Sequence, residues 1–389
     1  MTYVPISPKL LLWACERNGK TVDEFSERFP KLSSWIEKGI KPKLKELEDF
    51  ARVTHTPFGY FFLSDPPDEH LPISDFRTIE DLKIAKPSPN LIETIYAMQR
   101  RQDWLREYLI RYQAEPLEYV GSASLNDNPE HVGNEIRQRL GLEKGWSSEV
   151  KTWMDSIREF RRLIEHIGVY PVINSVVGNN TRRKLDVAEF RGFSLSDSYA
   201  PLIFVNGSDA KSAQIFTLAH ELAHIWLNKS GLSGFKDLFP AGESYSSGSE
   251  VEKWCNIVAA ELLVPKHELN KLRDSFINEH YDITKIAHGF RVSPIVLARR
   301  ALDLKLLDKI SFFKFYNHYK SLEVAKSSAD KKGGSFYQNM NPRVGKSFAA
   351  KVMADAIEGN TSFKEAYDLI GLRGSTFQKY AEILGFNIP

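Results

Sequence analysis

Residues 216–231, FTLAHELAHIWLNKSG, place two histidines and a glutamate inside an otherwise apolar helical pattern. Their apolar neighbours are Leu218, Leu222, Ile225 and Trp226. A helix with this pattern buries His220, Glu221 and His224 away from water. A buried imidazole needs a polar partner. A buried carboxylate has an even stronger need for one, because burying a charge costs more free energy. The fold must therefore bring further polar groups to this helix.

Composition places the chain among ordinary globular proteins. Of its 389 residues, 42% are hydrophobic and 26% are charged, which suits several domains with real cores. The net charge of +2 does not by itself indicate nucleic acid or a membrane surface. No apolar run reaches the roughly 20 residues that span a bilayer, and the N-terminal segment does not resemble a signal peptide. With only Cys15 and Cys255 present, no disulfide framework is expected, and we expect a cytoplasmic protein.

The chain divides by sequence pattern into five segments. Residues 1–70 contain four short amphipathic pieces separated by Gly and Pro, as in a helix-turn-helix bundle. Residues 71–145 hold a linker and a long helix from Asn90, whose Arg- and Gln-rich face we expect to contact solvent. Residues 146–280 form a core segment and 281–332 a helix-turn-helix-like segment. Residues 333–389 form a basic tail of two or three short helices.

The core segment predicts an α+β fold. Residues 150–168 repeat apolar residues every three or four positions, which indicates a helix that faces the core. Three strand-like stretches follow at 169–177, 187–196 and 200–206, and a turn at 206–209 then opens the histidine helix. A second helix, from 250 to 264, ends at Pro265. We therefore expect a small sheet with helices, flanked by all-helical segments on both sides.

The spacing of the two histidines predicts a metal site. His220 and His224 are one helical turn apart, so both leave the same face about 6 Å apart along the axis. This is the reach that two nitrogens need to bind one tetrahedral zinc ion. Glu221 lies about a hundred degrees round the helix, poorly placed as a ligand but able to reach a water on the metal. The alternative is a pair of hydrogen-bonded core histidines beside a surface glutamate.

A third zinc ligand is expected from the second helix, where Glu250, Glu252 and Glu261 are candidates. Periodicity separates them, because Glu252 lies on a face of small residues that lets the two helices approach closely. These residues are Cys255, Asn256, Ala259 and Ala260. Glu250 and Glu261 fall on the opposite side. Ser249 lies three residues before Glu252, so a helix capping box is the competing role for this carboxylate.

The two motifs together resemble those of the ImmA/IrrE family of metallo-endopeptidases. After FTLAHELAH, the stretch EKWCNIVAAELLVP has the family's glutamate, small residue and asparagine at the spacing of Glu252, Cys255 and Asn256. An Ala-Ala pair and a Leu-x-Pro ending follow, at 259–260 and 263–265. The resemblance covers residues 150–307 and departs from the family at Gln214, where many relatives carry arginine.

The resemblance implies a gluzincin-like core in which residues 200–206 form the sheet strand before the active helix. It implies Zn2+ as the cofactor, with His220, His224 and Glu252 as its ligands and Glu221 as general base and acid. In the metal-assisted hydrolysis so predicted, Glu221 takes a proton from water and later gives it to the leaving amine.

Further groups are expected beside this site. Tyr245, Arg191 and His267 are the candidates for an additional oxyanion donor. An exposed edge strand near the cleft would align the substrate backbone by strand addition, with 190–196 and 200–206 as candidates.

The flanking segments resemble helix-turn-helix modules. Residues 31–57 are similar to the XRE repressor type, but the piece at the recognition-helix position, KLSSWIEKG, is poor in the Arg, Gln and Asn that read base edges. Residues 283–307 carry a second such pattern, which the family resemblance makes a structural cap. Residues 291–389 hold 16 Lys or Arg against 9 Asp or Glu, a net of +7. We expect any DNA contact to come from this basic C-terminal region.

The leading interpretation is a zinc-dependent endopeptidase that cleaves a regulatory protein, in this family a helix-turn-helix repressor, in a mobile-element, stress-response or toxin–antitoxin circuit. The alternatives are a DNA-binding transcriptional regulator with a structural metal site and an antitoxin-like interaction protein with a dormant one. Structural zinc sites are usually closed by four protein ligands, which argues against the first alternative. No membrane partner is expected, and self-association of the chain stays open.

We predict that the isolated segment 1–70 does not bind DNA sequence-specifically. It carries ten Lys or Arg against eleven Asp or Glu, a net of −1, whereas DNA readers present a positive face. Affinity of the full chain for duplex DNA should reside in residues 291–389 and fall steeply with salt. A sequence-specific footprint from the N-terminal fragment alone would contradict this prediction.

Overall fold

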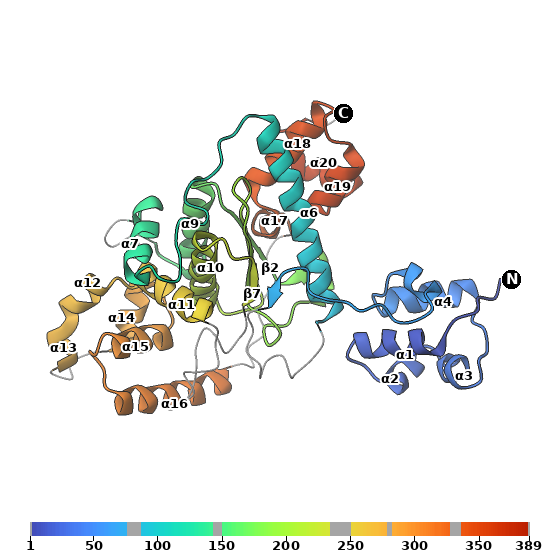
Figure 1. Ribbon diagram of the computed structural model, residues 1–389, viewed down its shortest axis with the longest axis horizontal. Helices are drawn as coiled ribbons and strands as arrows, with labels where there is room; N and C mark the ends of the chain where they lie inside the picture. Colours follow the sequence, from blue (N-terminus) through green and yellow to red (C-terminus); the bar gives the residue numbers. More distant parts are fainter. Residues whose placement is uncertain are drawn as a thin grey trace. The chain divides into compact units, whose positions relative to one another are not determined.

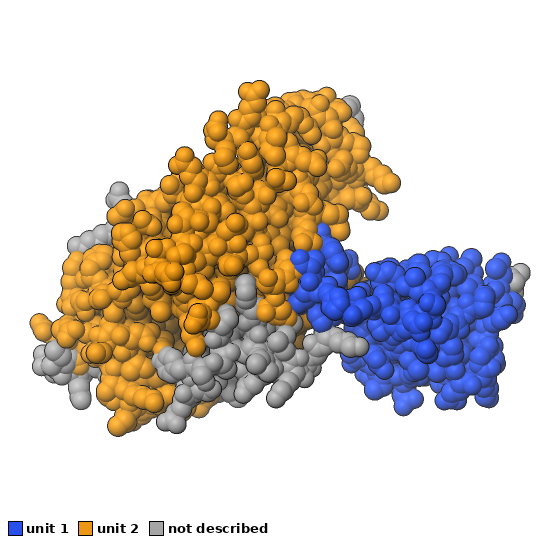
Figure 2. Space-filling model, viewed as in Figure 1, with its two compact units in different colours: residues 1–72, 82–96 blue, residues 73–81, 97–389 orange. Residues whose placement is uncertain are grey.

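The computed structural model describes residues 2–75, 87–142, 150–233, 250–277, 282–326 and 336–387. The chain forms two compact units, coloured separately in Figure 2. Unit 1 comprises Met1–Pro72 and Leu82–Tyr96, and unit 2 comprises Ile73–Asp81 and Ala97–Pro389. None of the helices in these described ranges combines the length and apolar character needed to cross a membrane.

Unit 1 is a set of short helices (Figure 1), and aromatic side chains fill its core. Phe50 packs edge-on against Phe25, Phe29 and Trp35, with ring centroids 6.0, 5.3 and 6.3 Å apart. Aromatic pairs of this geometry add to the stabilisation from burial. The helices, as expected from the four amphipathic pieces, are α1 (Pro8–Arg17), α2 (Val22–Ser26), α3 (Leu32–Glu37) and α4 (Leu44–Val53), followed by the 3-10 helix η1 (Phe58–Phe62).

Unit 2 is built on a mixed five-stranded sheet in the order β1-β7-β5-β6-β2. β2 runs parallel to β6, β5 is antiparallel to both β6 and β7, and β1 is parallel to β7. The strands are β1 (Ser74–Asp75), β2 (Tyr170–Asn174), β5 (Gly192–Leu195), β6 (Leu202–Asn206) and β7 (Gly231–Ser233). A separate antiparallel pair consists of β3 (Val176–Val177) and β4 (Asn180–Lys184).

The predicted α+β class with a small sheet is confirmed. The three predicted strand stretches contain β2, β5 and β6, which are buried along their whole length. β1 and β7 were not predicted, because two or three residues are too few to show a strand period. The expectation that 190–196 or 200–206 forms an exposed edge is wrong, because β5 and β6 each pair on both sides.

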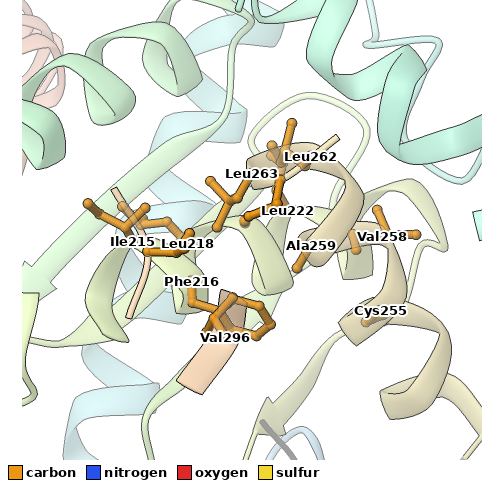
Figure 3. Packing of buried hydrophobic residues seen from close by; sticks show 14 of the residues in the cluster. Ile215, Phe216, Leu218, Leu222, Cys255, Val258, Ala259, Leu262, Leu263 and Val296 are labelled. Atoms are coloured by element: carbon orange, nitrogen blue, oxygen red, sulfur yellow. The ribbon is translucent and has the colours of Figure 1, made fainter. Parts of the chain in front are cut away.

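Two helices carry the polar residues singled out in the sequence. α10 (Lys211–Trp226) packs on β5 and β6, and α11 (Glu250–Leu263) packs on α10 through Cys255 and Ala259, which are completely buried (Figure 3). α7 (Pro129–Arg139) covers α11 and was not predicted. It lies very close, because a Cβ on Gly133 would be 2.8 Å from Glu261 Cβ and 3.0 Å from the Val258 carbonyl oxygen. Small residues therefore fix the spacing of these helices.

A helical segment follows α11 and packs into the same core. Arg291, in the left-handed conformation at φ 56°, ends α14, and the Ser293 hydroxyl caps α15 by accepting from Val296 N at 3.2 Å. Val296 and Leu297 join the apolar cluster around α10. The helices are α12 (Lys266–Leu269), η2 (Asn270–Leu272), α13 (Arg273–Ile277), α14 (Ile283–Phe290), α15 (Pro294–Asp303) and α16 (Lys309–Lys326).

The C-terminal tail forms four helices, where two or three were expected. They are α17 (Phe336–Val344), α18 (Lys346–Ile357), α19 (Phe363–Ile370) and α20 (Gly374–Ile383). α17 packs against β2, and Phe348 on α18 lies edge-on to Tyr170 of β2 at 5.4 Å. The expected glycine hinge at 333 lies outside the described residues.

Residues 97–111 of α6 (Pro89–Arg111) hold these C-terminal helices through polar contacts. Arg101 donates to the carbonyl oxygens of Leu369 and Arg343 at 2.8 and 2.9 Å. Arg111 pairs at 3.0 Å with Asp355, whose side chain is fully buried. The expectation that the Arg-rich face of this helix contacts solvent is therefore wrong for Arg101, which is buried, although Arg100, Arg106 and Arg111 are exposed. An amphipathic pattern shows which residues share a face, but it does not show which partner covers that face.

We predict that Phe348→Ala loosens the C-terminal helices. Phe348 is 1% exposed and packs against Trp104 and Tyr170, so its loss should cost about 3–5 kcal/mol. Amide hydrogen exchange in residues 336–387 should accelerate accordingly. Ile357→Ala is the matched control, because Ile357 lies on the same helix and is 43% exposed. Equal acceleration in both variants would contradict the packing described.

Candidate metal centre

Three side chains from two helices converge in the interior of unit 2. His220 and His224 leave one face of α10, and Glu252 faces them from the first turn of α11. The two Nε2 atoms are 3.1 Å apart, and each lies 3.1 Å from an oxygen of Glu252. All three side chains are at most 1% exposed. Their donor atoms lie within 4.8 Å of one another, which is close enough to hold one metal ion.

The geometry and chemistry of this cluster fit a tetrahedral metal ion. Two atoms that each lie about 2.0–2.1 Å from a tetrahedral zinc are about 3.3 Å apart, and the contacts here are 3.1 Å. Two imidazole nitrogens with one carboxylate form a donor set that zinc prefers. Three protein ligands leave a coordination position for water or substrate, as in catalytic zinc sites.

Asn256 orients one of the imidazoles. Its Oδ1 lies 3.0 Å from His220 Nδ1. Since an amide oxygen only accepts, the proton is assigned to Nδ1, and the lone pair of Nε2 then faces the cluster. Asn256 stands one turn after Glu252, so one helical face supplies both groups. From the sequence, Asn256 was expected on this face among the small residues without a role of its own, although its polar side chain was a usable signal.

Glu221 extends from α10 toward β5. Its carboxyl is fully buried, and this burial raises its pKa, against the influence of the two histidines and the Ser233 hydroxyl. Neither of its oxygens has a hydrogen-bond partner of normal geometry among the described residues. Gly192 leaves the necessary room, because a Cβ there would lie 2.9 Å from Glu221 Oε1 and 2.6 Å from Thr217 Cγ2. A buried carboxyl without fixed partners is suited to proton exchange.

The two carboxyls of the site are shifted in opposite directions. Burial alone would raise the pKa of Glu252, but His220 and His224 outweigh it and lower that pKa to about 2. Glu252 is therefore an anion at neutral pH, as a metal ligand must be. The raised pKa of Glu221 favours the protonated form instead. The opposite shifts suit two different roles, a metal ligand for Glu252 and a proton carrier for Glu221.

The other candidate ligands lie elsewhere. Glu250 is exposed. Glu261 is buried, but it pairs with Arg300 and accepts from the backbone N of Lys266 at 3.2 Å, so it ties α11 to α15 and to the start of α12. Of the three glutamates on α11, the structure brings only Glu252 to the histidines. The competing capping role depends on Ser249, which lies outside the described residues.

Of the expected oxyanion donors, the two that lie in the described residues have their contacts elsewhere. Arg191 lies 3.4 Å from Asp209, in the turn before α10, and both side chains are largely buried. His267 is mostly exposed and lies 3.7 Å from Glu268. Tyr245 lies outside the described residues.

Gln214, the departure from the family pattern, closes the turn that starts α10. Its Nε2 donates to the carbonyl oxygens of Gly207 and Asp209 at 3.1 and 2.7 Å. The amide therefore orders the loop between β6 and the helix that carries the histidines.

Comparison with known families agrees with this geometry. Residues 177–302 match the family model of the IrrE N-terminal-like domain, peptidase family M78, which indicates a metallopeptidase domain. This range contains His220, Glu221, His224 and Glu252, so the resemblance noted from the sequence is confirmed there. Residues 344–383 match a domain of unknown function (DUF8813). The comparison with curated proteins gives no match.

We predict one tightly held zinc ion per chain. Glu252→Ala should lower the zinc content after dialysis, because it removes one of three ligands and leaves the two imidazoles alone. Glu250→Ala is the matched control on the same helical turn and should keep its zinc. Metal analysis by mass spectrometry measures both variants. Equal zinc loss in the two, or in neither, would refute the assignment of Glu252.

Proposed function

We propose that this chain is a zinc-dependent endopeptidase that cleaves a regulatory protein, and that a helix-turn-helix repressor is its substrate class. The observation that carries the proposal is the buried His220, His224 and Glu252 cluster with Glu221 beside it on α10. All four lie in the range that matches a metallopeptidase family. The family match indicates a metallopeptidase domain, and we add to it a specific reaction and a substrate class.

The residues of the site divide the chemistry among them. His220, His224 and Glu252 would hold zinc, which supplies a Lewis acid that polarises the peptide carbonyl and activates water. Glu221 accepts the proton of the attacking water and passes it to the leaving amine. For the first step its carboxyl must be ionised. Burial opposes ionisation by raising the pKa of Glu221, whereas the two neighbouring histidines favour it, as the charge of a bound zinc ion would. Asn256 keeps the His220 ring in one orientation through the 3.0 Å contact.

Selectivity is expected to come from the flanking helices rather than from the site alone. Unit 1 carries a net charge of −1 over residues 1–70 and exposes large apolar side chains, including Tyr3, Ile40 and Phe62, which are 55, 51 and 57% exposed. This surface suits protein contact better than contact with DNA phosphates. Docking a helix-turn-helix substrate on such a module would raise its effective concentration at the active site.

The basic C-terminal region, with its net charge of +7 over residues 291–389, is the part we assign to DNA contact. This contact would bring the peptidase to a repressor bound at its operator. It is secondary to the peptidase proposal, which does not depend on it.

The alternative function is a regulator or interaction protein with a structural metal site. One observation favours it, namely that the four side chains of the site are at most 1% exposed. The ligand set argues against it, because structural zinc sites usually take four protein ligands and the described residues bring three together. A fully buried Glu221 beside the cluster also has no structural purpose in a closed site.

Glu221→Gln separates these functions. The substitution keeps the shape of the side chain and all three zinc ligands but removes the proton acceptor. We expect normal zinc content and normal binding of the cognate repressor, with hydrolysis slowed about 10²–10⁴-fold. Mass-spectrometric time courses of repressors encoded by neighbouring genes, with and without chelator, measure the effect, and Glu250→Gln serves as the matched control. Equal cleavage rates for wild type and Glu221→Gln would contradict the proposal, as would wild-type protein that cuts none of these repressors.

A further inference from the structure

A cavity of about 720 Å³ lies in unit 2, at the opposite end of α10 from the histidines. α9 (Trp153–His166), the end of β2, the start of α10 and the helices α17 and α18 line it. Its volume falls in the range of small-molecule sites. Lys211 and His220 are nine residues apart on α10, so about 13 Å of helix separates the cavity from the metal cluster.

The lining of the cavity is strongly basic. Six of its sixteen lining residues are Arg or Lys and one, Glu165, is acidic. The six are Arg158, Arg161, Arg162, Lys211, Arg343 and Lys346. Three of these arginines have an acidic partner one turn away on α9. Arg161 pairs with Glu165, and Arg158 and Arg162 pair with Asp155 and Glu159. The pairs of Arg158 and Arg162 are exposed, and exposed pairs contribute little, so an incoming anion can replace them.

Two of the cavity arginines are desolvated without full compensation. Arg161 is 9% exposed and its Nε has no hydrogen-bond partner in the described part of the chain. Its contacts run through one terminal nitrogen, at 3.1–3.4 Å from Glu165, the Pro171 carbonyl oxygen and the Asn341 carbonyl oxygen. Partial burial lowers the pKa of Arg343, and no described carboxylate pairs with its guanidinium. Glu165 therefore compensates Arg161 only in part, and Arg343 has no such partner among the described residues, which favours an anionic ligand in this cavity.

The backbone adds to this positive potential. α10 and α18 both begin at the cavity, with Lys211 and Lys346 as their first residues, and neither has a side-chain cap or an acidic residue in its first turn. These helices have 16 and 12 residues, long enough for open N–H groups and the helix dipole to favour an anion. The parallel strands β2 and β6 end here too, a common position for ligands in sheets with parallel strands.

We propose that this cavity binds a small organic phosphate, a nucleoside phosphate being the chemical class that fits best. Arginine forks and helix N-termini recognise phosphate oxygens. Met154, Ile157, Ile173 and Pro342 offer apolar lining for the organic part. A concave cavity closed by elements from α9 to α18 suits a compact ligand better than the continuous backbone of a duplex. This site is independent of the proposed peptidase reaction.

The test is isothermal titration of the full zinc-loaded chain with ATP, with inorganic pyrophosphate and with uncharged adenosine. ATP and pyrophosphate should bind at one site, and adenosine should not bind. In Arg343→Ala/Lys346→Ala we expect at least tenfold weaker binding, because two phosphate contacts are lost while the metal ligands stay. The matched control is Lys364→Ala/Arg373→Ala, which removes two cations from the same helical region outside the cavity and should bind as wild type does.

Three results would overturn the proposal. The first is that neither ATP nor pyrophosphate binds the wild type, which would show that the cavity is not a phosphate site. The second is that both double variants weaken ATP binding equally, which would show that ATP is attracted by the general positive charge of the surface rather than bound in this cavity. The third is a duplex oligonucleotide that binds more tightly than ATP, displaces it, and loses affinity in Arg343→Ala/Lys346→Ala. That result would show that the ligand of the cavity is nucleic acid rather than a small phosphate. Unchanged thermal unfolding of the variants confirms that each is folded.

Discussion

The burial of two imidazoles and two carboxyls around α10 is the constraint on which the rest of unit 2 depends. Such groups are stable in an apolar core only when their charges compensate one another or a metal ion. Compensation requires contacts near 3 Å, as found around Glu252, and so requires helices that approach closely. Cys255 and Ala259 permit that approach, Gly133 lets α7 cover α11, and Gly192 lets β5 pass beside Glu221. Small residues at these positions thus serve the polar cluster rather than the core alone.

α10 links the two polar regions of the unit. Its C-terminal half carries the histidines, and its first turn lies at the basic cavity, where Gln214 fastens the preceding loop through two carbonyl oxygens. The C-terminal helices close that cavity and are held by Arg101, Arg111 and Trp104 of α6. A phosphate ligand at the start of α10 would therefore contact the same helix that positions the metal ligands. Both proposals predict that this helix is among the most protected parts of the chain.

The sequence predicted what local periodicity encodes. One-turn spacing identified His220 and His224, the small face of the second helix selected Glu252, and three stretches indicated the long strands. What depends on distant partners was not predictable. β7 is too short to show a period, and α7 lay in the segment 71–145, where only a linker and one long helix were expected. The arginine face of α6 looked like a solvent face because nothing local indicates that Leu369 and Arg343 carbonyl oxygens accept from it. Asn256 was visible, but only its contact with His220 gives it a role.

The central claim is that His220, His224 and Glu252 are the protein ligands of one zinc ion. X-ray absorption at the zinc edge of the metal-loaded full chain tests it most directly. We expect a shell of nitrogen and oxygen ligands at about 2.0–2.1 Å, with two imidazoles contributing and no sulfur. Cys255 is buried on the same helix as Glu252, and its thiol is the alternative metal ligand on that face. A sulfur ligand at about 2.3 Å, or a shell with fewer than two imidazoles, would contradict the account.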